Sequence, residues 1–179
     1  MPTSTADLWE SLAHEAERES ALWGQALRPP ARREREAVFS PLGEERFALG
    51  LETIYEGYLL HYGRPRLFAP RDSDTGLLLG DYLYAHGLVR VAAVDGVAAV
   101  SDLAELISLC AQLRAEGSGD DGPLWAASAA LLGSGTLDEA RTALRMRGDA
   151  SALDSAARAA AGDAAVERAL ALHRKRRLR

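Results

Sequence analysis

With 179 residues, nearly half of them hydrophobic, the chain is long enough for one domain with a substantial core and too apolar for general disorder. Its formal net charge of −5 argues against a nucleic-acid-binding protein, and its single cysteine excludes an internal disulfide and a multi-cysteine zinc site. The polar, acidic N-terminal residues do not resemble a signal peptide, and no apolar run reaches the length of a membrane span. We therefore expect a cytoplasmic protein with no transmembrane segment and no nucleic-acid partner.

The N-terminal residues 1–38 predict one helix followed by a charged linker. The helix is expected from about Thr5 to Leu27, with Trp9 and Trp23 at the two ends of its apolar stripe. Two tryptophans on one stripe indicate a docking surface, either for the chain's own core or for another chain. Pro29 and Pro30 end the helix, and the charged residues that follow are expected to form a solvated linker or short helix.

Residues 42–133 predict four further helices. We expect them at about 42–62, 77–94, 97–115 and 124–132, separated by Gly63, by the Asp95-Gly96 turn and by a Gly-rich loop. Ser73 or Asp74 is expected to cap the helix at 77–94. In the first of the four helices, Glu45, Glu52 and Glu56 are expected to point into solvent, and Cys110 in the third is expected to be a core residue.

The helix from Leu77 to Val94 is apolar on nearly every side, which is typical of a helix buried among others. Gly80 and Gly87 lie two turns apart on one side of it. With Tyr84 between them they predict a close-packing surface, located either at a subunit interface or in the monomer core. Asp81 lies inside the apolar run, so we expect it to be buried and paired, with Arg64 and Arg66 as candidate partners.

The C-terminal residues 134–179 predict three shorter, alanine-rich helices at about 137–146, 151–161 and 163–177. The last one ends in a basic tail. Positive charge is favourable at the C-terminus of a helix, and contact with nucleic acid or a membrane is the alternative role. Because no strand-like alternation occurs in the sequence, we predict a single all-α domain over residues 1–179, built as a helical bundle.

Motifs of common catalytic and metal sites are absent: there is no nucleophile elbow, P-loop, H-E-x-x-H or C-x-x-C. The histidines lack a second ligand at helical spacing and are interpreted as structural, although the helices of His61 and His86 would allow these two to face one another. The acidic pair Asp120 and Asp121 could bind a divalent cation, but such a pair in a Gly-rich loop is usually solvent-facing. We therefore predict no metal site.

The loop between the two helices at 42–62 and 77–94 is rich in arginine. Arg64, Arg66 and Arg71 lie close together in the sequence, and guanidinium groups bind phosphate through bidentate, charge-assisted hydrogen bonds. The sequence thus allows a diphosphate site in this loop, with surface salt bridges to neighbouring aspartates as the alternative.

Four stretches follow one another in the order of motifs of the trans-polyprenyl diphosphate synthases: ETIYEGYLLH at 52–61, GRP at 63–65, LLGDYLYA at 78–85 and PLWAASAALLG at 123–133. The chain resembles the first half of that family over residues 42–133, which implies part of the isoprenoid synthase fold. The family binds magnesium and an allylic diphosphate through aspartate-rich motifs. Matching without a gap puts Tyr62, Gly63 and Arg66 where the carboxylates of the first motif would be, and matching GRP to GRP deletes that motif. No second motif occurs. We therefore expect no cofactor of its own and no prenyl transfer by the chain alone.

Within that family the chain is most similar to the small, non-catalytic subunit of a two-component heptaprenyl diphosphate synthase of menaquinone biosynthesis. The resemblance implies an accessory subunit that binds a catalytic chain, helps set product length and meets magnesium only through that partner. It also implies a dimer, with the catalytic chain or with itself. The structural or interface residues are then Gly80, Asp81, Tyr84, Gly87, Trp9 and Trp23.

Two other hypotheses remain. A helical interaction or regulatory protein unrelated to isoprenoids would better explain the alanine-rich C-terminal part. An enzyme that uses the arginine-rich loop for other diphosphate chemistry is the third possibility.

Overall fold

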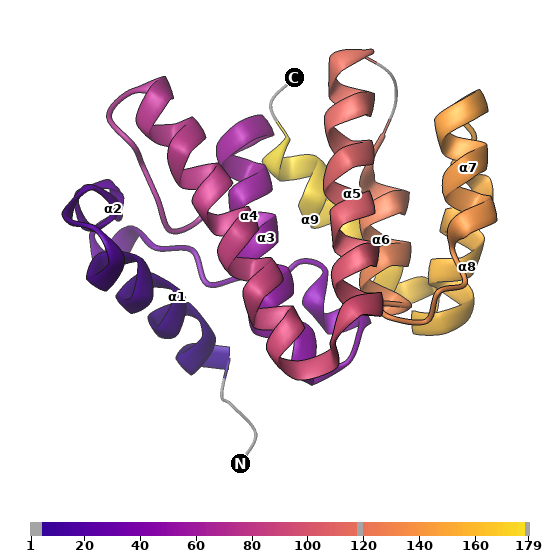
Figure 1. Cartoon of the computed structure of the whole chain (residues 1–179), viewed down its shortest axis with the longest axis horizontal. Coiled ribbons are helices and arrows are strands. Elements are labelled where there is room, and N and C mark those ends of the chain that lie inside the picture. Colours follow the sequence, from indigo (N-terminus) through magenta and orange to yellow (C-terminus); the bar gives the residue numbers. More distant parts are fainter. Residues whose placement is uncertain (1–4, 118–119, 178–179) are drawn as a thin grey trace.

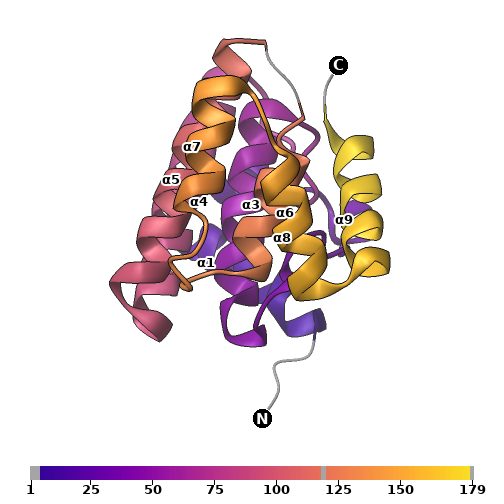
Figure 2. The same cartoon turned by 90° about the vertical axis from the view of Figure 1, so that its right-hand side faces the viewer.

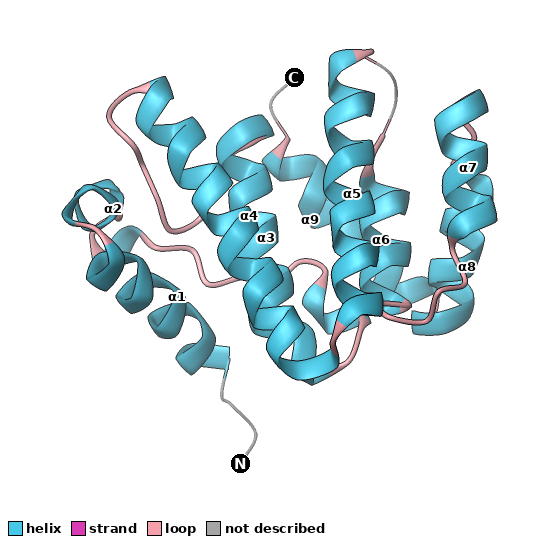
Figure 3. Ribbon diagram, viewed as in Figure 1, coloured by secondary structure: helices cyan, strands magenta, loops and turns pink. Residues whose placement is uncertain are grey.

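The computed structural model describes residues 5–117 and 120–177, and every regular element in these residues is a helix (Figure 3). This confirms the predicted all-α fold. The α-helices are α1 (Thr5–Glu19), α2 (Ala21–Ala26), α3 (Ala48–Tyr62), α4 (Ser73–Asp95), α5 (Val97–Ala115), α6 (Gly122–Ala130), α7 (Asp138–Arg147), α8 (Ser151–Ala161) and α9 (Asp163–Arg176).

The helices form a bundle in which α3 is central. In Figure 1, α4 and α5 form a hairpin at the front of the molecule, α3 lies behind α4, and α6 and α9 lie behind α5. Helices α1 and α2 lie on one side, and α7 and α8 lie on the other, as the view in Figure 2 also shows. Of the helix pairs that contact one another, α3 and α4 share by far the most extensive contact.

Several element boundaries differ from those predicted. The N-terminal helix is interrupted at Ser20, whose hydroxyl accepts a hydrogen bond from the backbone N–H of Leu22 and so starts α2. Short 3-10 turns at 40–42 and 45–47 precede α3, which therefore begins at Ala48 instead of residue 42. Asp72, not Ser73 or Asp74, caps α4 by accepting from Thr75 N at 2.7 Å. The starts of α2 and α4 depend on single side-chain contacts, which periodicity does not report, whereas α3 starts without a side-chain cap.

Glycines allow α3 and α4 to pack closely. A Cβ atom on Gly87 would lie 2.4 Å from Ile54 Cγ1 and 3.0 Å from the carbonyl oxygen of Gly50, and a Cβ on Gly57 would lie 2.9 Å from the carbonyl oxygen of Gly80. The close approach predicted for Gly80 and Gly87 therefore occurs, but the neighbour is α3 of the same chain. Assigning these glycines to a subunit interface is wrong, because their surface is already covered.

Helix α4 is not buried on every side, contrary to the sequence-based expectation. Its Asp81 side chain is 71% exposed and lies 3.2 Å from Nε2 of His61, not next to Arg64 or Arg66. Leu78 and Val89 are also mainly exposed. An apolar pattern all round a helix cannot distinguish a covered face from an uncovered one, and here α3 covers only one side.

By length and composition alone, one stretch of the described residues, Ser73–Val94, could span a membrane. The expectation that no apolar run reaches this length does not hold for α4, but one weak candidate is consistent with the prediction of no transmembrane segment. Core helices of soluble proteins meet the same criterion, so this single stretch is weak evidence for a membrane span.

The buried side chains form two clusters. The larger one lies among α3, α5, α6, α8 and α9 and includes Cys110, as predicted. The smaller one joins α1 and α2 to the 67–68 segment and α4, and it contains the fully buried Trp9. Trp23 is half-buried and stacks on Tyr82 with ring centroids 5.7 Å apart. Both tryptophans therefore dock on their own chain, and Trp9 is not available to a partner.

Replacing Gly87 by alanine is expected to lower the free energy of unfolding by about 1–3 kcal/mol. The new methyl group would overlap Ile54 and the Gly50 carbonyl, and overpacking of this kind costs more than the helix propensity that alanine gains, up to about 1 kcal/mol. Urea denaturation followed by circular dichroism measures the change. Gly24→Ala is the matched control, since the nearest side-chain atom there is the flexible Glu17 Cγ at 3.3 Å. Equal midpoints for the two variants would contradict the close packing.

Candidate functional site

The three arginines predicted to bind diphosphate do not come together. Arg66 is fully buried, whereas Arg64 is exposed and donates to the carbonyl oxygen of Lys175 at 2.7 Å. Arg71 lines a separate cleft of about 210 Å³ between α2 and the start of α4. A common phosphate group cannot reach all three guanidinium groups, because one of them is inside the protein. The predicted diphosphate site is therefore not formed.

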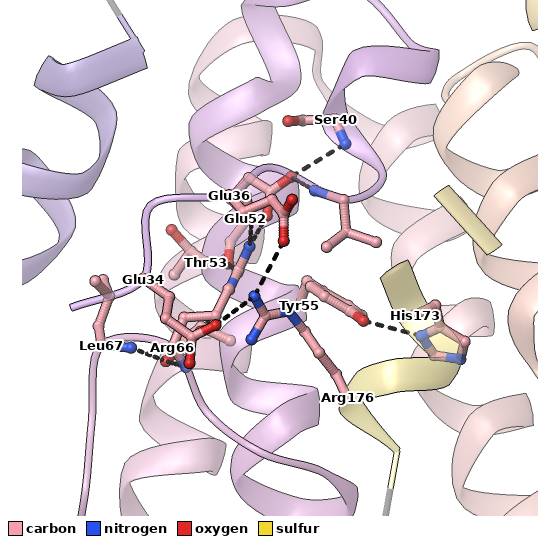
Figure 4. A network of polar contacts seen from close by, with 12 residues as sticks. Glu34, Glu36, Ser40, Glu52, Thr53, Tyr55, Arg66, Leu67, His173 and Arg176 are labelled. Carbon is pink, nitrogen blue, oxygen red and sulfur yellow. Dashed lines mark hydrogen bonds and ion pairs between the residues drawn. The ribbon is translucent and has the colours of Figure 1, made fainter. Parts of the chain in front are cut away.

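Arg66 instead occupies the centre of a buried ion-pair network. Its Nε donates to Glu56 at 2.9 Å and its Nη1 donates to Glu52 at 2.5 Å, and neither carboxylate is accessible to solvent (Figure 4). The prediction that Glu52 and Glu56 point outward is thus wrong. Helical spacing alone places both glutamates on one face, but only the loop that returns over that face supplies the cation that permits their burial.

The remaining hydrogen-bonding groups of these three residues are also used. Glu52 accepts from the backbone N–H groups of Val38 and Ser40 at 3.2 Å, and Glu56 accepts from those of Arg66 and Leu67. Burial alone would lower the pKa of Arg66, but the carboxylates of Glu52 and Glu56 outweigh it and raise that pKa above its ordinary value. The network is therefore charged and structural, and it ties the linker and the 63–72 loop to α3.

Arg66→Met is expected to lower the free energy of unfolding by about 3–5 kcal/mol, because two carboxylates would stay buried without a cation. Chemical denaturation at neutral pH measures the effect. Arg71→Met is the matched control, since Arg71 is exposed and belongs to the same loop. A loss no larger than that of the control would show that the network is not required for stability.

A second buried polar network joins α3, the start of α6 and α9. Asp121 accepts from the Tyr58 hydroxyl at 2.6 Å and lies 3.0 Å from His173 Nε2, while His173 Nδ1 lies 2.9 Å from the Tyr55 hydroxyl. Arg114 Nε lies 3.4 Å from Asp121. Asp121 is buried, so its predicted solvent-facing position is wrong. The sequence signal for the burial of His173 is its helical spacing from Val166, Ala169 and Leu170, which are also buried in α9.

Oxygen and nitrogen atoms of Asp120, Asp121 and His173 lie within 4.8 Å of one another, as a metal site would require. Both ring nitrogens of His173 are, however, engaged by Tyr55 and Asp121. A metal ion would have to displace one of these buried contacts. Hydrogen bonding explains the cluster completely, and it supports no metal assignment.

The basic C-terminal segment is bound to the rest of the chain. Arg176 is buried and lies 2.8 Å from Glu34 and 3.4 Å from Glu36 of the linker (Figure 4). Arg177 pairs through its backbone with Gly63. The tail up to Arg177 is therefore not a free basic patch for nucleic acid or a membrane. Residues 178 and 179 lie outside the described residues.

Acidification is expected to weaken the Asp121 network. Burial raises the pKa of Asp121, but hydrogen bonds from His173 and Tyr58 outweigh it and lower the pKa from 3.8 to about 2. A carboxyl whose folded pKa is lowered stabilises the fold above its unfolded pKa, and it loses that contribution as the pH falls towards the folded value. Between about pH 4 and pH 2 the wild type should lose on the order of 2 kcal/mol more than Asp121→Asn.

This prediction is measured by urea denaturation at a series of pH values. Asp138→Asn, with a side chain 88% exposed, is the control for removing one surface carboxylate. Parallel pH profiles for the wild type and Asp121→Asn would contradict the assignment.

The remaining candidate site is an exposed apolar face on the α4–α5 hairpin. On α4 its exposed members recur at helical spacing, as Leu78, Ala85, Val89 and Ala92. On α5 the corresponding exposed members are Val97, Ser101, Ala104, Ser108 and Ala111, which are mostly small. The two helices that carry these stripes lie at the front of the molecule in Figure 1. Large apolar side chains that are exposed on two neighbouring helices, here Leu78, Val89 and Val97, mark an interaction surface in many proteins. We call these residues the α4–α5 face.

Sequence analysis did not identify this face: it predicted α4 to be buried on every side and did not single out the exposed stripe of α5. The signal was present, because small residues at positions 101, 104, 108 and 111 repeat at helical spacing opposite the buried stripe of Leu103, Leu106, Cys110 and Leu113.

Neither of the two histidines on α3 and α4 faces the other. His61 stacks on Tyr84 at 5.1 Å beside the α4–α5 face, and burial lowers its pKa although Asp81 opposes that change. His86 lies 2.9 Å from Glu15 of α1, which also binds Arg90. Each histidine thus holds two helices of this chain together.

Over residues 5–117 and 120–177, the geometry is that of an all-α protein with charged networks inside and an exposed apolar face on α4 and α5. No protein-family model matches the chain, and neither a curated protein nor a solved structure matches it.

Proposed function

We propose that this chain is a non-catalytic accessory or regulatory subunit of a cytoplasmic polyprenyl diphosphate synthase, which binds the catalytic chain through the α4–α5 face. The observation that carries the proposal is the exposure of large apolar side chains on a hairpin that is otherwise well packed. Val89 and Val97 are 65% and 86% exposed, respectively. Covering such side chains with a partner is favourable, at about 25 cal/mol for each Å² of apolar surface removed from water.

The shape of the face suits a helical partner. Alanine and serine predominate on α5, and small side chains let the backbones of two helices approach closely. The identity of the partner comes from the resemblance of residues 42–133 to the trans-polyprenyl diphosphate synthases. The stretch LLGDYLYA of that resemblance lies on α4 itself.

The alternative of a diphosphate enzyme built on the arginine-rich loop receives less support. Two buried carboxylates compensate the charge of Arg66 inside the protein. Arg64 binds the carbonyl oxygen of Lys175, and Arg71 lines a separate cleft. The bundle interior beside α3 is filled by aromatic side chains, with the rings of Phe39, Tyr55, Tyr58 and Trp125 in mutual contact. In the proposed role magnesium and the isoprenoid diphosphates are held by the catalytic partner.

Val89→Glu is expected to weaken binding to the catalytic chain by roughly tenfold or more, since it places a charge in an interface that must exclude water. The partner is the synthase chain of the same genome that retains both aspartate-rich motifs. Calorimetric titration gives the affinity, and light scattering gives the mass of the complex. Met146→Glu is the matched control, because Met146 is 71% exposed but lies on α7.

An undetectable complex with the wild type, or equal affinities for Val89→Glu and the control, would contradict this function. The hypothesis of an interaction protein unrelated to isoprenoids uses the same face. That hypothesis would be favoured if the synthase chain does not bind and a different helical chain does, provided that Val89→Glu abolishes the binding of this other chain.

A further inference from the structure

We propose that α7 is a strap that opens away from the bundle while the other helices stay folded, and that ion pairs with α5 hold it closed. The inference goes beyond the proposed function and does not depend on it. Helix α7 lies at the right-hand edge of the bundle in Figure 1, and among the described helices only α8 makes more than marginal contact with it. A helix with few neighbours can open at a lower free energy than the whole domain.

Apolar packing holds α7 only weakly. Leu144 is the one large apolar side chain that the helix itself buries, with Leu137 buried just before it, whereas Met146 is 71% exposed. Between α7 and α5 the bundle has a groove of about 390 Å³ instead of a packed contact, and charged and hydroxyl side chains of both helices line it. Few buried apolar contacts are typical of segments that open locally.

Two ion pairs cross this groove. Arg141 Nη1 lies 2.6 Å from Asp102 Oδ1, and Arg145 of the next turn pairs with Glu105. The first pair is buried, so salt screens it little. Asp102 also accepts from the backbone N–H of Gly133 at 2.7 Å, and it thus holds both α7 and the turn before it. The link between α7 and α5 is therefore chiefly electrostatic.

The closed position leaves part of Arg141 unsatisfied. Its Nε is buried, and none of the described residues accepts a hydrogen bond from it. Its Nη2 has contacts of 3.4 and 3.5 Å, with the carbonyl oxygen of Asp102 and the hydroxyl of Ser128. A buried donor without a good partner costs free energy, and opening would hydrate it. This cost narrows the free-energy difference between the closed and the open strap.

The two turns that flank α7 can act as hinges. Gly135 and Gly148 have positive φ angles of 66° and 67°, a region that residues other than glycine rarely adopt. A Cβ atom at either position would meet open space, so these turns are not packed against other segments. Rotation about the two turns would move α7 and leave α8 packed on α6.

Opening changes the surface that the bundle presents. Leu144 belongs to the larger core cluster, and Arg141 covers the carboxylate of Asp102, which is 5% exposed. With α7 open, the core position that Leu144 fills and the Asp102 carboxylate both become accessible. Opening therefore reveals an apolar and acidic surface that the closed state hides.

The test is native-state hydrogen exchange of the backbone amides, measured at increasing urea concentrations. We expect the hydrogen-bonded amides of α7 to exchange roughly tenfold or more faster than the slowest amides of α5, with little dependence on urea. Asp102→Asn should accelerate the α7 amides by roughly a further tenfold or more, because the buried ion pair is lost. Glu105→Gln should accelerate them less, since its pair is partly exposed. Glu139→Gln is the matched control, because Glu139 is an exposed acid of the same helix.

Gly87→Ala separates opening of the strap from global unfolding. This variant disturbs the contact of α3 with α4, so it should accelerate the slowest α5 amides and leave the α7 amides unchanged. Acceleration of the α7 amides together with those of α5 would overturn the proposal, and so would an effect of Asp102→Asn no larger than that of Glu139→Gln. Circular dichroism verifies that Asp102→Asn is folded. If it is not, Glu105→Gln takes its place in the comparison with the same control.

Discussion

The buried ion pairs of Arg66 with Glu52 and Glu56 are the interaction on which the arrangement of the other elements depends. Three full charges lie inside the protein, and they are stable there only because their groups bond to one another and to the surrounding backbone. The glutamates lie on α3, the arginine lies on the loop before α4, and its guanidinium also bonds to the backbone of Glu36 in the linker and lies over the ring of Trp9 on α1. One side chain thus fixes the positions of three segments against the central helix.

The position of the loop determines how α4 meets α3, and glycines set the distance between them. Gly50 and Gly57 on α3 face Gly87 and Gly80 on α4, so the two backbones are in contact. This close contact uses one side of α4 and leaves the opposite side uncovered. The exposed apolar stripe on α4 is therefore a direct consequence of the glycine packing, and it continues onto α5 because the two helices form a hairpin.

Polar contacts also connect α6 and α9 to the central helix α3. Asp121 and His173 join the start of α6 and the end of α9 to two tyrosines of α3, and Arg176 returns to the linker. Charges that the sequence spreads over distant segments are thereby paired inside one domain. Among the described residues, most of the large apolar side chains that stay exposed lie on α4 and α5.

The sequence by itself determined most of the helices, the glycine-mediated approach along α4 and the burial of Cys110, because helix periodicity and glycine spacing are local properties. It did not determine which partner each charge would have. Glu52 and Glu56 were predicted to be solvated and Asp81 to be buried, and the structure reverses both. A charge is buried or exposed according to what the chain brings opposite it, and for Glu52 that group is Arg66, fourteen residues away along the chain. Only the tertiary structure decides such pairings, since they arise when separate segments fold over the same helix face.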